Sequence, residues 1–297
     1  MENTFKYRLL EFIFKGIGSL SHSNRLRLGA VLSWFLPFIV KRRVHIIRTN
    51  FKLAFPEASK QQIEQWTKQN IRLTTQSFID RGVLWYAPLD KIHEMTTLEG
   101  VDYLKQVQAN HEPLMILAPH FIGLDTAATI LTTHIPDGCT MYKSQHDPVF
   151  DALIRKGRAR FNTVHLLSRQ DGIRGIIRHM RNGVALYYLP DMDFGRDESI
   201  FVPFFGIQSA TLSSTAQIAK TFKAKVCPVV TRLDIKTGIY HIKVLPPLDN
   251  FPGEGTIEEA TARLNRLLEE WIRQDPVQYY WIHRRFKTRP EGEKELY

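Results

Sequence analysis

The sequence predicts an α/β protein with a mixed, largely parallel sheet flanked by helices. From residue 112 onwards, short apolar runs alternate with segments of helical period, which is the pattern of parallel strands joined by helices. With 43% hydrophobic and 24% charged residues, the composition is that of a globular protein. We expect an N-terminal helical, membrane-associating extension over residues 1–45 and one α/β domain over residues 46–297.

The N-terminal segment has two apolar stretches. In the first, apolar residues recur every three or four positions, at Phe5, Leu9, Ile13, Ile17 and Leu20, which predicts an amphipathic helix. The second, residues 28–40, would reach roughly 20 Å as a helix, less than the ~30 Å core of a bilayer. Basic residues 41–43 follow it. A short apolar segment with a cationic collar favours a helix lying in the membrane interface, and a buried helix pair covering the domain is the alternative.

The remaining elements follow in order along the chain. Residues 48–96 are predicted to be helical, with a capping-box pattern at Ser59 and Gln62. Strands are predicted over residues 114–118, 140–143, 164–167, 184–189, 226–232 and 240–245, and helices over residues 123–133, 147–161, 171–181, 212–222 and 257–273. No internal repeat or linker is apparent.

Charge and cysteine content restrict the partners. The formal net charge is +10, which suits an anionic partner such as a lipid, an acidic carrier protein or a nucleic acid without choosing among them. The only cysteines are Cys139 and Cys227, and no Cys/His spacing typical of a metal site is present. We therefore expect a reducing compartment and no metal.

A histidine and an acid follow the strand predicted over residues 114–118. His120 comes directly after Pro119, and a helix of small residues begins near Gly123. Five residues along a regular helix rotate a side chain by about 140°, so His120 and Asp125 can meet only if His120 precedes the helix. A carboxylate that holds an imidazole makes it an effective general base toward an alcohol. We predict His120 as the base and Asp125 as the acid that orients it.

The same spacing occurs a second time. His146 and Asp151 also form an H-x₄-acid pattern after a predicted strand. Because the spacing is short and both residue types are common, one match is expected by chance. Spacing alone does not select the catalytic pair, and further motifs are needed.

Several further motifs give the sequence a family resemblance. They are Asn50 and residues 55–57, 98–100, 120–125, 155–158, 191–195, 201–206 and 281–292. Together they resemble the bacterial lipid A biosynthesis acyltransferase family, within the wider lysophospholipid acyltransferase superfamily, over essentially the whole chain. The C-terminal motif, from Trp281 to Gly292, is the most specific.

The resemblance implies a glycerolipid acyltransferase-like fold and a reaction. The enzyme is expected to move a fatty acyl group from an acyl carrier protein thioester to a hydroxyl of a Kdo-bearing lipid A precursor, an anionic lipid. It would do so at the cytoplasmic face of the inner membrane. No cofactor is expected, because the thioester is already activated. Members that act on lipid A usually carry Glu where this chain has Asp125, so O-acylation of a lysophospholipid, ornithine lipid or glycolipid remains an alternative.

The resemblance also implies substrate-binding residues, beginning with two arginines on the helix predicted over residues 147–161. Arg158, together with Arg155, is expected to bind a phosphate or stabilise the thioester oxyanion, because a guanidinium donates several hydrogen bonds. A solvated helix face is the alternative for both. Asp191 and Asp193 are expected to shape the site or to pair with an arginine.

Two later segments are expected to contact substrate as well. Residues 201–206, including Phe204 and Gly206, are expected to line the acyl channel, with ordinary core packing as the alternative. Arg284 and Arg285 are expected to hold anionic lipid headgroups or to dock the acidic acyl carrier protein. A solvated basic tail is the alternative there.

Two other functional classes fit the sequence less well. A non-catalytic nucleic-acid- or membrane-binding protein would need its basic residues in a continuous stripe, whereas Lys and Arg are scattered among acids here. We therefore expect no nucleic-acid partner. A thioesterase or other serine hydrolase would be expected to carry a G-x-S-x-G elbow, which is missing, and no P-loop is found either.

Overall fold

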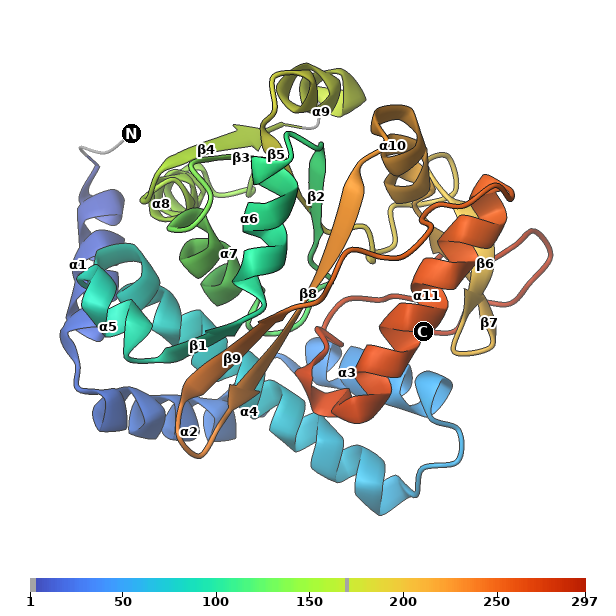
Figure 1. Ribbon diagram of the computed structural model, residues 1–297. Coiled ribbons are helices and arrows are strands. Elements are labelled where there is room, and N and C mark those ends of the chain that lie inside the picture. Colours follow the sequence, from blue (N-terminus) through green and yellow to red (C-terminus); the bar gives the residue numbers. More distant parts are fainter. Residues whose placement is uncertain (1–3, 169–170) are drawn as a thin grey trace.

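The fold is built around one seven-stranded sheet (Figure 1). The computed structural model describes residues 4–168 and 171–297. In spatial order the strands are β1 (Thr96–Glu99), β9 (Ile239–Val244), β8 (Lys225–Asp234), β2 (Leu114–Leu117), β5 (Ala185–Tyr188), β3 (Asp137–Met141) and β4 (Thr163–Leu167). All neighbouring strands pair in parallel except β8 and β9. The predicted mixed, largely parallel sheet is confirmed.

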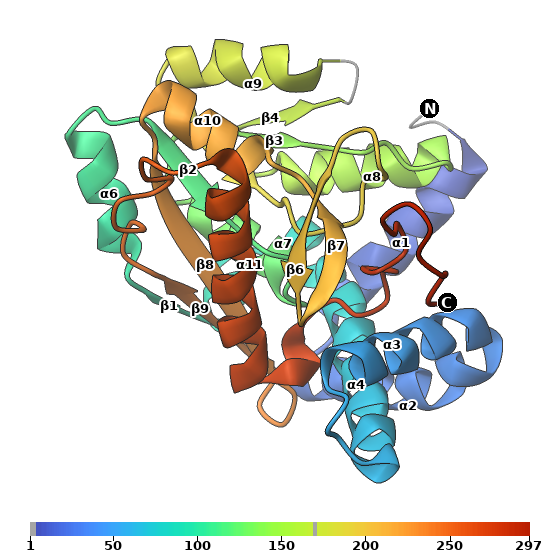
Figure 2. The ribbon, with the colours of Figure 1, turned by 90° about the vertical axis from the view of Figure 1, so that its right-hand side faces the viewer.

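Helices surround this sheet. Those before the central strands are α1 (Phe5–Ser19), α2 (His22–Ile39), α3 (Lys41–Ala54), α4 (Lys60–Tyr86), α5 (Leu89–His93) and α6 (Val101–Ala109). The later ones are α7 (Leu124–Thr132), α8 (Pro148–Arg158), α9 (Gly172–Arg181), α10 (Ser214–Phe222), α11 (Ile257–Gln274) and the 3₁₀ turn η1 (Pro276–Gln278). Helix α6 packs on β2, β8 and β9, whereas α9 packs on β3, β4 and β5. Figure 2 shows the same arrangement from the side.

Most predicted elements coincide with observed ones, and the differences have local causes. The segment 48–96 is not one helical run. Turns at Pro56 and Pro88 interrupt it and separate α3, α4 and α5. Strand β1, helix α6 and the antiparallel hairpin of β6 (Ile200–Phe204) and β7 (Ile207–Thr211) were not predicted. The predicted domain boundary at residue 45 lies inside α3.

The core lies on both faces of the sheet. Along β2, Leu114 and Ile116 belong to the larger apolar cluster, whereas Met115 and Leu117 belong to the second cluster. Alternate residues of a strand point to opposite faces, so a strand that is covered on both sides reads as a continuous apolar run. This explains why β2 was recognisable from sequence.

The N-terminal helices cross α4 at close range. Their meeting point is Gly18 of α1, where an added Cβ would lie 2.4 Å from the carbonyl oxygen of Gly82 on α4. Nearby, the buried ring of Phe14 contacts Trp85, with ring centroids 4.8 Å apart. Glycine on both helices therefore allows backbone to approach backbone, and α1 packs as part of the domain.

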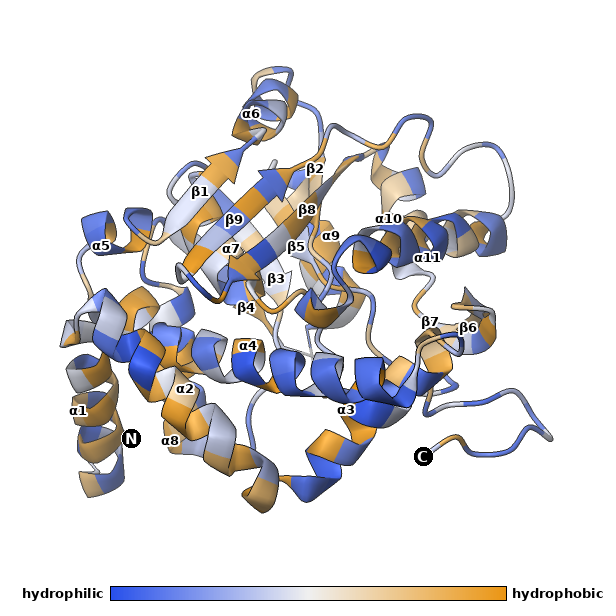
Figure 3. Cartoon of the chain, turned by 90° about the horizontal axis from the view of Figure 1, so that it is seen from below, coloured by the Kyte–Doolittle hydropathy of each residue, from blue (hydrophilic) through white to orange (hydrophobic). Residues whose placement is uncertain are grey.

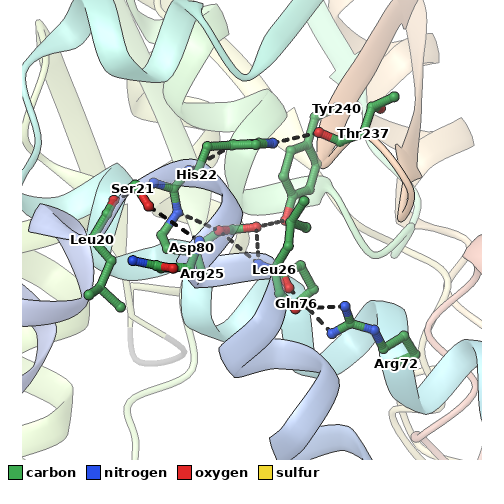
Figure 4. A network of polar contacts seen from close by, with 11 residues as sticks. Leu20, Ser21, His22, Arg25, Leu26, Arg72, Gln76, Asp80, Thr237 and Tyr240 are labelled. Atoms are coloured by element: carbon green, nitrogen blue, oxygen red, sulfur yellow. Dashed lines mark hydrogen bonds and ion pairs between the residues drawn. The ribbon is translucent and has the colours of Figure 1, made fainter.

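A buried polar network joins α2 to α4 (Figure 4). The carboxylate of Asp80 accepts hydrogen bonds from Arg25 Nε at 3.2 Å and from the amide of Gln76 at 3.1 Å. Its second oxygen accepts a bond of 2.9 Å from the hydroxyl of Tyr240 on β9. Asp80 and Arg25 are both buried. The first half of α2 is thus held by an ion pair whose other hydrogen bonds are supplied by α4 and the sheet.

The second half of α2 is exposed and apolar. Figure 3 shows this end of the helix in orange, next to the hydrophilic start of α3. Helix α2 continues through Pro37 to Ile39. On α1, the first three residues of the predicted stripe, Phe5, Leu9 and Ile13, are exposed, while Tyr7 and Phe14 are buried instead. Among the described residues, no helix combines the length and apolarity needed to cross a bilayer.

The glycine crossing can be tested by stability. Gly18→Ala is expected to lower the free energy of unfolding by about 1–3 kcal/mol, because the new methyl group would overlap the backbone of α4. Gly16 on the same helix is the matched control, since nothing lies within 4 Å of a Cβ added there. Gly16→Ala should stabilise the protein by up to about 1 kcal/mol. Chemical denaturation measures both, and equal stabilities would contradict the close crossing.

Candidate active site

His120 lies at the carboxyl end of β2, and its partner lies at the end of the neighbouring strand. Leu117 of β2 is in register with Tyr188 of β5, and His120 and Asp191 each follow this pair by three residues. The ring Nδ1 of His120 lies 2.8 Å from Oδ1 of Asp191. Carboxyl ends of adjacent parallel strands meet at one edge of the sheet, which is where open α/β sheets place ligand sites.

Asp191 holds both the ring and the backbone of His120. Its Oδ2 accepts the backbone N–H of His120 at 2.8 Å and the hydroxyl of Tyr279 at 2.8 Å. Burial alone would raise the pKa of Asp191, but the charge of His120 and these hydrogen bonds lower it below its usual value. An ionised Asp191 accepts a hydrogen bond from Nδ1–H, so the proton stays on Nδ1 and the lone pair of the imidazole is on Nε2.

The loop that carries His120 is fixed by the segment after α11. Ile122 donates its backbone N–H to the carbonyl of Gln278 at 2.8 Å, and Tyr280 donates to the carbonyl of His120 at 2.8 Å. From α4, Ser77 donates its hydroxyl to the carbonyl of Ile122 at 2.8 Å. His120 itself stays partly accessible, with 16% of its side chain exposed. The loop of His120 is therefore held on several sides, while its ring stays partly accessible.

Asp125 makes different contacts from the one predicted. Its Oδ1 accepts hydrogen bonds from Arg158 Nε at 3.0 Å and Nη2 at 2.7 Å, and its Oδ2 accepts one from Arg81 Nη2 at 2.8 Å. Burial alone would raise the pKa of Asp125, but the two guanidinium groups lower it to about 2. The prediction that Asp125 orients the ring of His120 is corrected: both of its oxygens bind arginines, and Asp191 binds the ring.

The second His–acid pattern does not form a pair of this kind. Asp151 accepts hydrogen bonds from the hydroxyl of Tyr142 at 2.7 Å, the backbone of Gln145 at 2.6 Å and Arg155 Nε at 2.9 Å. His146 is exposed on the loop before α8. The structure thus distinguishes the two histidines: the ring of His120 binds a buried carboxylate, whereas His146 is exposed.

The family follows from comparison with known proteins. A family model described as bacterial lipid A biosynthesis acyltransferase matches residues 4–288 of this chain. The chain belongs to this family. It is therefore an acyltransferase, and the resemblance inferred from the motifs is confirmed.

Individual relatives of this acyltransferase have related names. It is 33% identical over 272 residues to the lipid A biosynthesis lauroyltransferase of Escherichia coli (strain K12), covering 91% of this chain and 88% of that protein. It is 30% identical over 272 residues to the palmitoleoyltransferase of the same organism, covering 91% and 86%. For the myristoyltransferase the identity is 32% over 248 residues, covering 84% and 76%.

Asp193, another predicted site residue, connects the C-terminal segment to the loop after β5. Asp193 accepts hydrogen bonds from the backbone and hydroxyl of Thr288 at 2.7 and 2.8 Å, and its own N–H donates to Nε2 of His283 at 3.0 Å. Burial, with the charges of His120 and Arg285, lowers the pKa of His283 to about 4. A neutral His283 is what this acceptor position requires.

The remaining predicted residues have mostly structural contacts. Arg155 binds Asp151 on its own helix and lies over the ring of Tyr142, 4.8 Å from its centroid. Arg284 lies 5.9 Å from the ring centroid of Tyr297. Their predicted contacts with substrate stay predictions.

Two predicted substrate residues are buried. Arg285 is 1% exposed and donates to the carbonyl of Ala210 and the hydroxyl of Thr211. Its guanidinium stacks 4.7 Å from the ring centroid of Phe204, which is 0% exposed. This burial is at odds with the predicted headgroup contact of Arg285 and matches the core alternative for Phe204. Gly206 has a φ of +74° in the β6–β7 turn.

Two site residues were missed. Arg81 lies one helical turn beyond Ser77, so both side chains face the 120–125 loop, but nothing in a helical pattern distinguishes a site arginine from a solvated one. Tyr279 precedes the predicted C-terminal motif and holds Asp191. Both depend on contacts between segments far apart in sequence.

The pairing of Asp125 with Arg81 and Arg158 (the arginine clamp) predicts an acid-sensitive contribution to the free energy of unfolding. The folded-state pKa is about 2, against 3.8 for an ordinary aspartate, so the contribution is complete above pH ~4 and is lost as pH falls toward 2. The advantage of the wild type over Asp125→Asn should shrink by about 2 kcal/mol over that window. Urea denaturation at pH 6 and pH 2.5 measures it, with Asp197→Asn, an exposed position, as control. A constant difference would contradict the clamp.

Proposed function

We propose that this acyltransferase moves a fatty acyl group from an acyl carrier protein thioester to a hydroxyl of a Kdo-bearing lipid A precursor, with His120 as general base. The observation that carries the proposal is the hydrogen bond of 2.8 Å between His120 Nδ1 and Asp191. It leaves Nε2 of a partly exposed ring as the acceptor for a proton. Family membership and the names of the relatives support this choice of substrate class.

The reaction needs one proton acceptor that later becomes a donor. Nε2 of His120 takes the proton of the acceptor hydroxyl as its oxygen attacks the carbonyl carbon of the thioester. The tetrahedral intermediate then collapses, the carbon–sulfur bond breaks, and the leaving thiolate receives the proton from the imidazolium. The products are an ester and a free thiol. No cofactor is required, because the thioester supplies the driving force.

Asp191 is proposed as the positioning residue for this base. It fixes the tautomer through Nδ1, and its negative charge stabilises the imidazolium that forms during transfer. Because Tyr279 and the backbone N–H of His120 bind its other oxygen, the carboxylate cannot rotate away. General-base assistance of this kind contributes about 10²–10⁴ to a rate.

The acceptor is tested in cells. Mass spectrometry of lipid A should show one acyl chain missing in a strain that lacks this gene, and a plasmid-borne wild-type copy should restore it. His120→Ala should fail to restore the chain, whereas His146→Ala should restore it because His146 is exposed and outside the site. Unchanged lipid A in the deletion strain would reject this acceptor and favour acylation of another lipid.

The positioning role is tested with purified enzyme. Asp191→Asn should reduce kcat by at least about 100-fold while preserving the fold, because an amide does not stabilise the imidazolium. Asp151→Asn, which alters the acid of the other pattern, is the matched control and should retain most activity. Initial rates with an acyl carrier protein thioester measure both. Comparable losses in the two variants would contradict the assignment of Asp191.

We further propose that the enzyme works on the cytoplasmic face of the inner membrane, attached through the end of α2. Trp34, Phe35, Phe38 and Ile39 are between 51% and 78% exposed there. Exposed basic residues 41–43 follow directly. An apolar surface next to basic residues suits an anionic bilayer, in which aromatic side chains enter the interface and cations meet lipid phosphates.

The depth of this attachment is limited by the contacts of α2. Its first half is fixed to α4 through Arg25 and Asp80, so only the second half is available to lipid. The rings of Trp34 and Phe35 meet edge to face with centroids 4.6 Å apart, which presents one compact aromatic surface. We therefore propose insertion at the interface, and not across the bilayer.

Vesicle sedimentation tests this attachment. The double variant Trp34→Asp/Phe38→Asp should bind vesicles of phosphatidylcholine and phosphatidylglycerol at least about tenfold more weakly, because two apolar side chains no longer enter the lipid. Ile173→Asp, at another exposed apolar position on α9, is the matched control and should bind like the wild type. Equal binding of all three proteins would place the contact elsewhere.

A further inference from the structure

A cluster of guanidinium groups on Asp125, five residues after His120, is not used by the proton transfer. Arg81 from α4 and Arg158 from α8 both bind the single carboxylate of Asp125 on α7. Two positive charges therefore share one negative charge, which leaves an excess of positive charge at this place. The side chains of Arg81 and Arg158 are 24% and 31% exposed, so they can be reached from solution.

Hydrogen-bonding capacity in this cluster is incomplete. Only Nη2 of Arg81 donates to Asp125, and Nε of Arg81 is buried without a partner among the described residues. Arg158 uses Nε and Nη2 for the carboxylate. A buried N–H without an acceptor is costly. Asp125 holds both guanidinium groups in place but does not bind all of their N–H donors.

Tyr280 connects this cluster to the base. Its ring lies beside that of His120, with centroids 6.5 Å apart, and its backbone N–H donates to the carbonyl of His120. The charges of Arg81, Arg43 and Asp125 all act on its phenol group. Arg43 of α3 also donates to the carbonyl of Ile282, two residues after Tyr280, at 3.3 Å.

We propose that Arg81 and Arg158, held in position by Asp125, form a binding site for a phosphate ester of the substrates. A phosphate monoester carries close to two negative charges and a phosphodiester carries one, and both offer several acceptor oxygens that paired guanidinium forks can bind. The phosphate can belong to the acceptor lipid or to the carrier arm of the donor. The site rests on the proposed function, since it would place a substrate beside the general base. Asp125 is then a positioning residue for arginines.

Binding is measured first, without any need for activity. Thermal unfolding of the full chain is followed with increasing inorganic phosphate or pyrophosphate, against sodium chloride at equal ionic strength. The wild type should be stabilised saturably. Arg81→Gln and Arg158→Gln should need about 10- to 100-fold more phosphate for the same shift. Arg181→Gln, an exposed arginine on α9, is the matched control and should respond like the wild type.

Kinetics then identify the source of the phosphate. Arg81→Gln should raise KM for the acceptor and lose the wild-type preference for the phosphorylated over the dephosphorylated acceptor, if the acceptor supplies it. If the donor supplies it, KM should rise for the acyl carrier protein thioester but not for acyl-pantetheine, which has no phosphate. Arg81→Lys should be intermediate, because a lysine keeps the charge but not the fork.

Three results would overturn the site. They are a wild type without a saturable phosphate shift, an Arg81→Gln variant with the wild-type shift, and a loss of kcat at unchanged KM, which would assign the arginines to the transition state. Should Arg81→Gln be unstable without phosphate, Arg81→Lys decides the same question. Phosphate binding without any acyl transfer would refute the proposed function and leave the anion site standing.

Discussion

The active site depends on one carboxylate that three donors share. Asp191 accepts the ring and the backbone N–H of His120 and the hydroxyl of Tyr279. Because β2 and β5 are adjacent and parallel, the loops after them meet without any adjustment of the sheet. The C-terminal segment supplies Tyr279 and Tyr280 to the same loops, so His120 is fixed from the sheet and from the C-terminal segment.

Helix α4 organises the opposite side of the site. Two consecutive residues on it, Asp80 and Arg81, make different ion pairs: Asp80 with Arg25 on α2, and Arg81 with Asp125 on α7. Successive residues on a helix are about 100° apart, so one turn of α4 serves both the N-terminal helices and the site. The position of Arg81 is consequently tied to how α1 and α2 pack on this helix.

Sequence reasoning predicted most of the sheet, since strands covered on both faces read as apolar runs, as in β2. It located His120 because a strand pattern ends just before it. It could not find the partner of that histidine, because β3 and β4 lie between β2 and β5 in sequence while the two strands touch in space. Phe204 was equally ambiguous, since an apolar residue that lines a channel and one that fills a core look alike. Arg81 had no signal, because its meaning depends on an acid 44 residues away.

The Asp80 network changes how the N-terminal helices can be handled. Apolar helices in the N-terminal part of an enzyme can be mistaken for a detachable anchor. Here, cutting the chain after Ile39 would strip Arg25 from the carboxylate of Asp80, which would keep only the hydrogen bonds of Gln76 and Tyr240, and would open the face of α4 on which Phe14 and Gly18 rest. A buried acid that loses its cation is strongly destabilising. These helices are therefore structural parts of the catalytic domain. A protein shortened to remove them would lose contacts that the fold of the remaining domain needs.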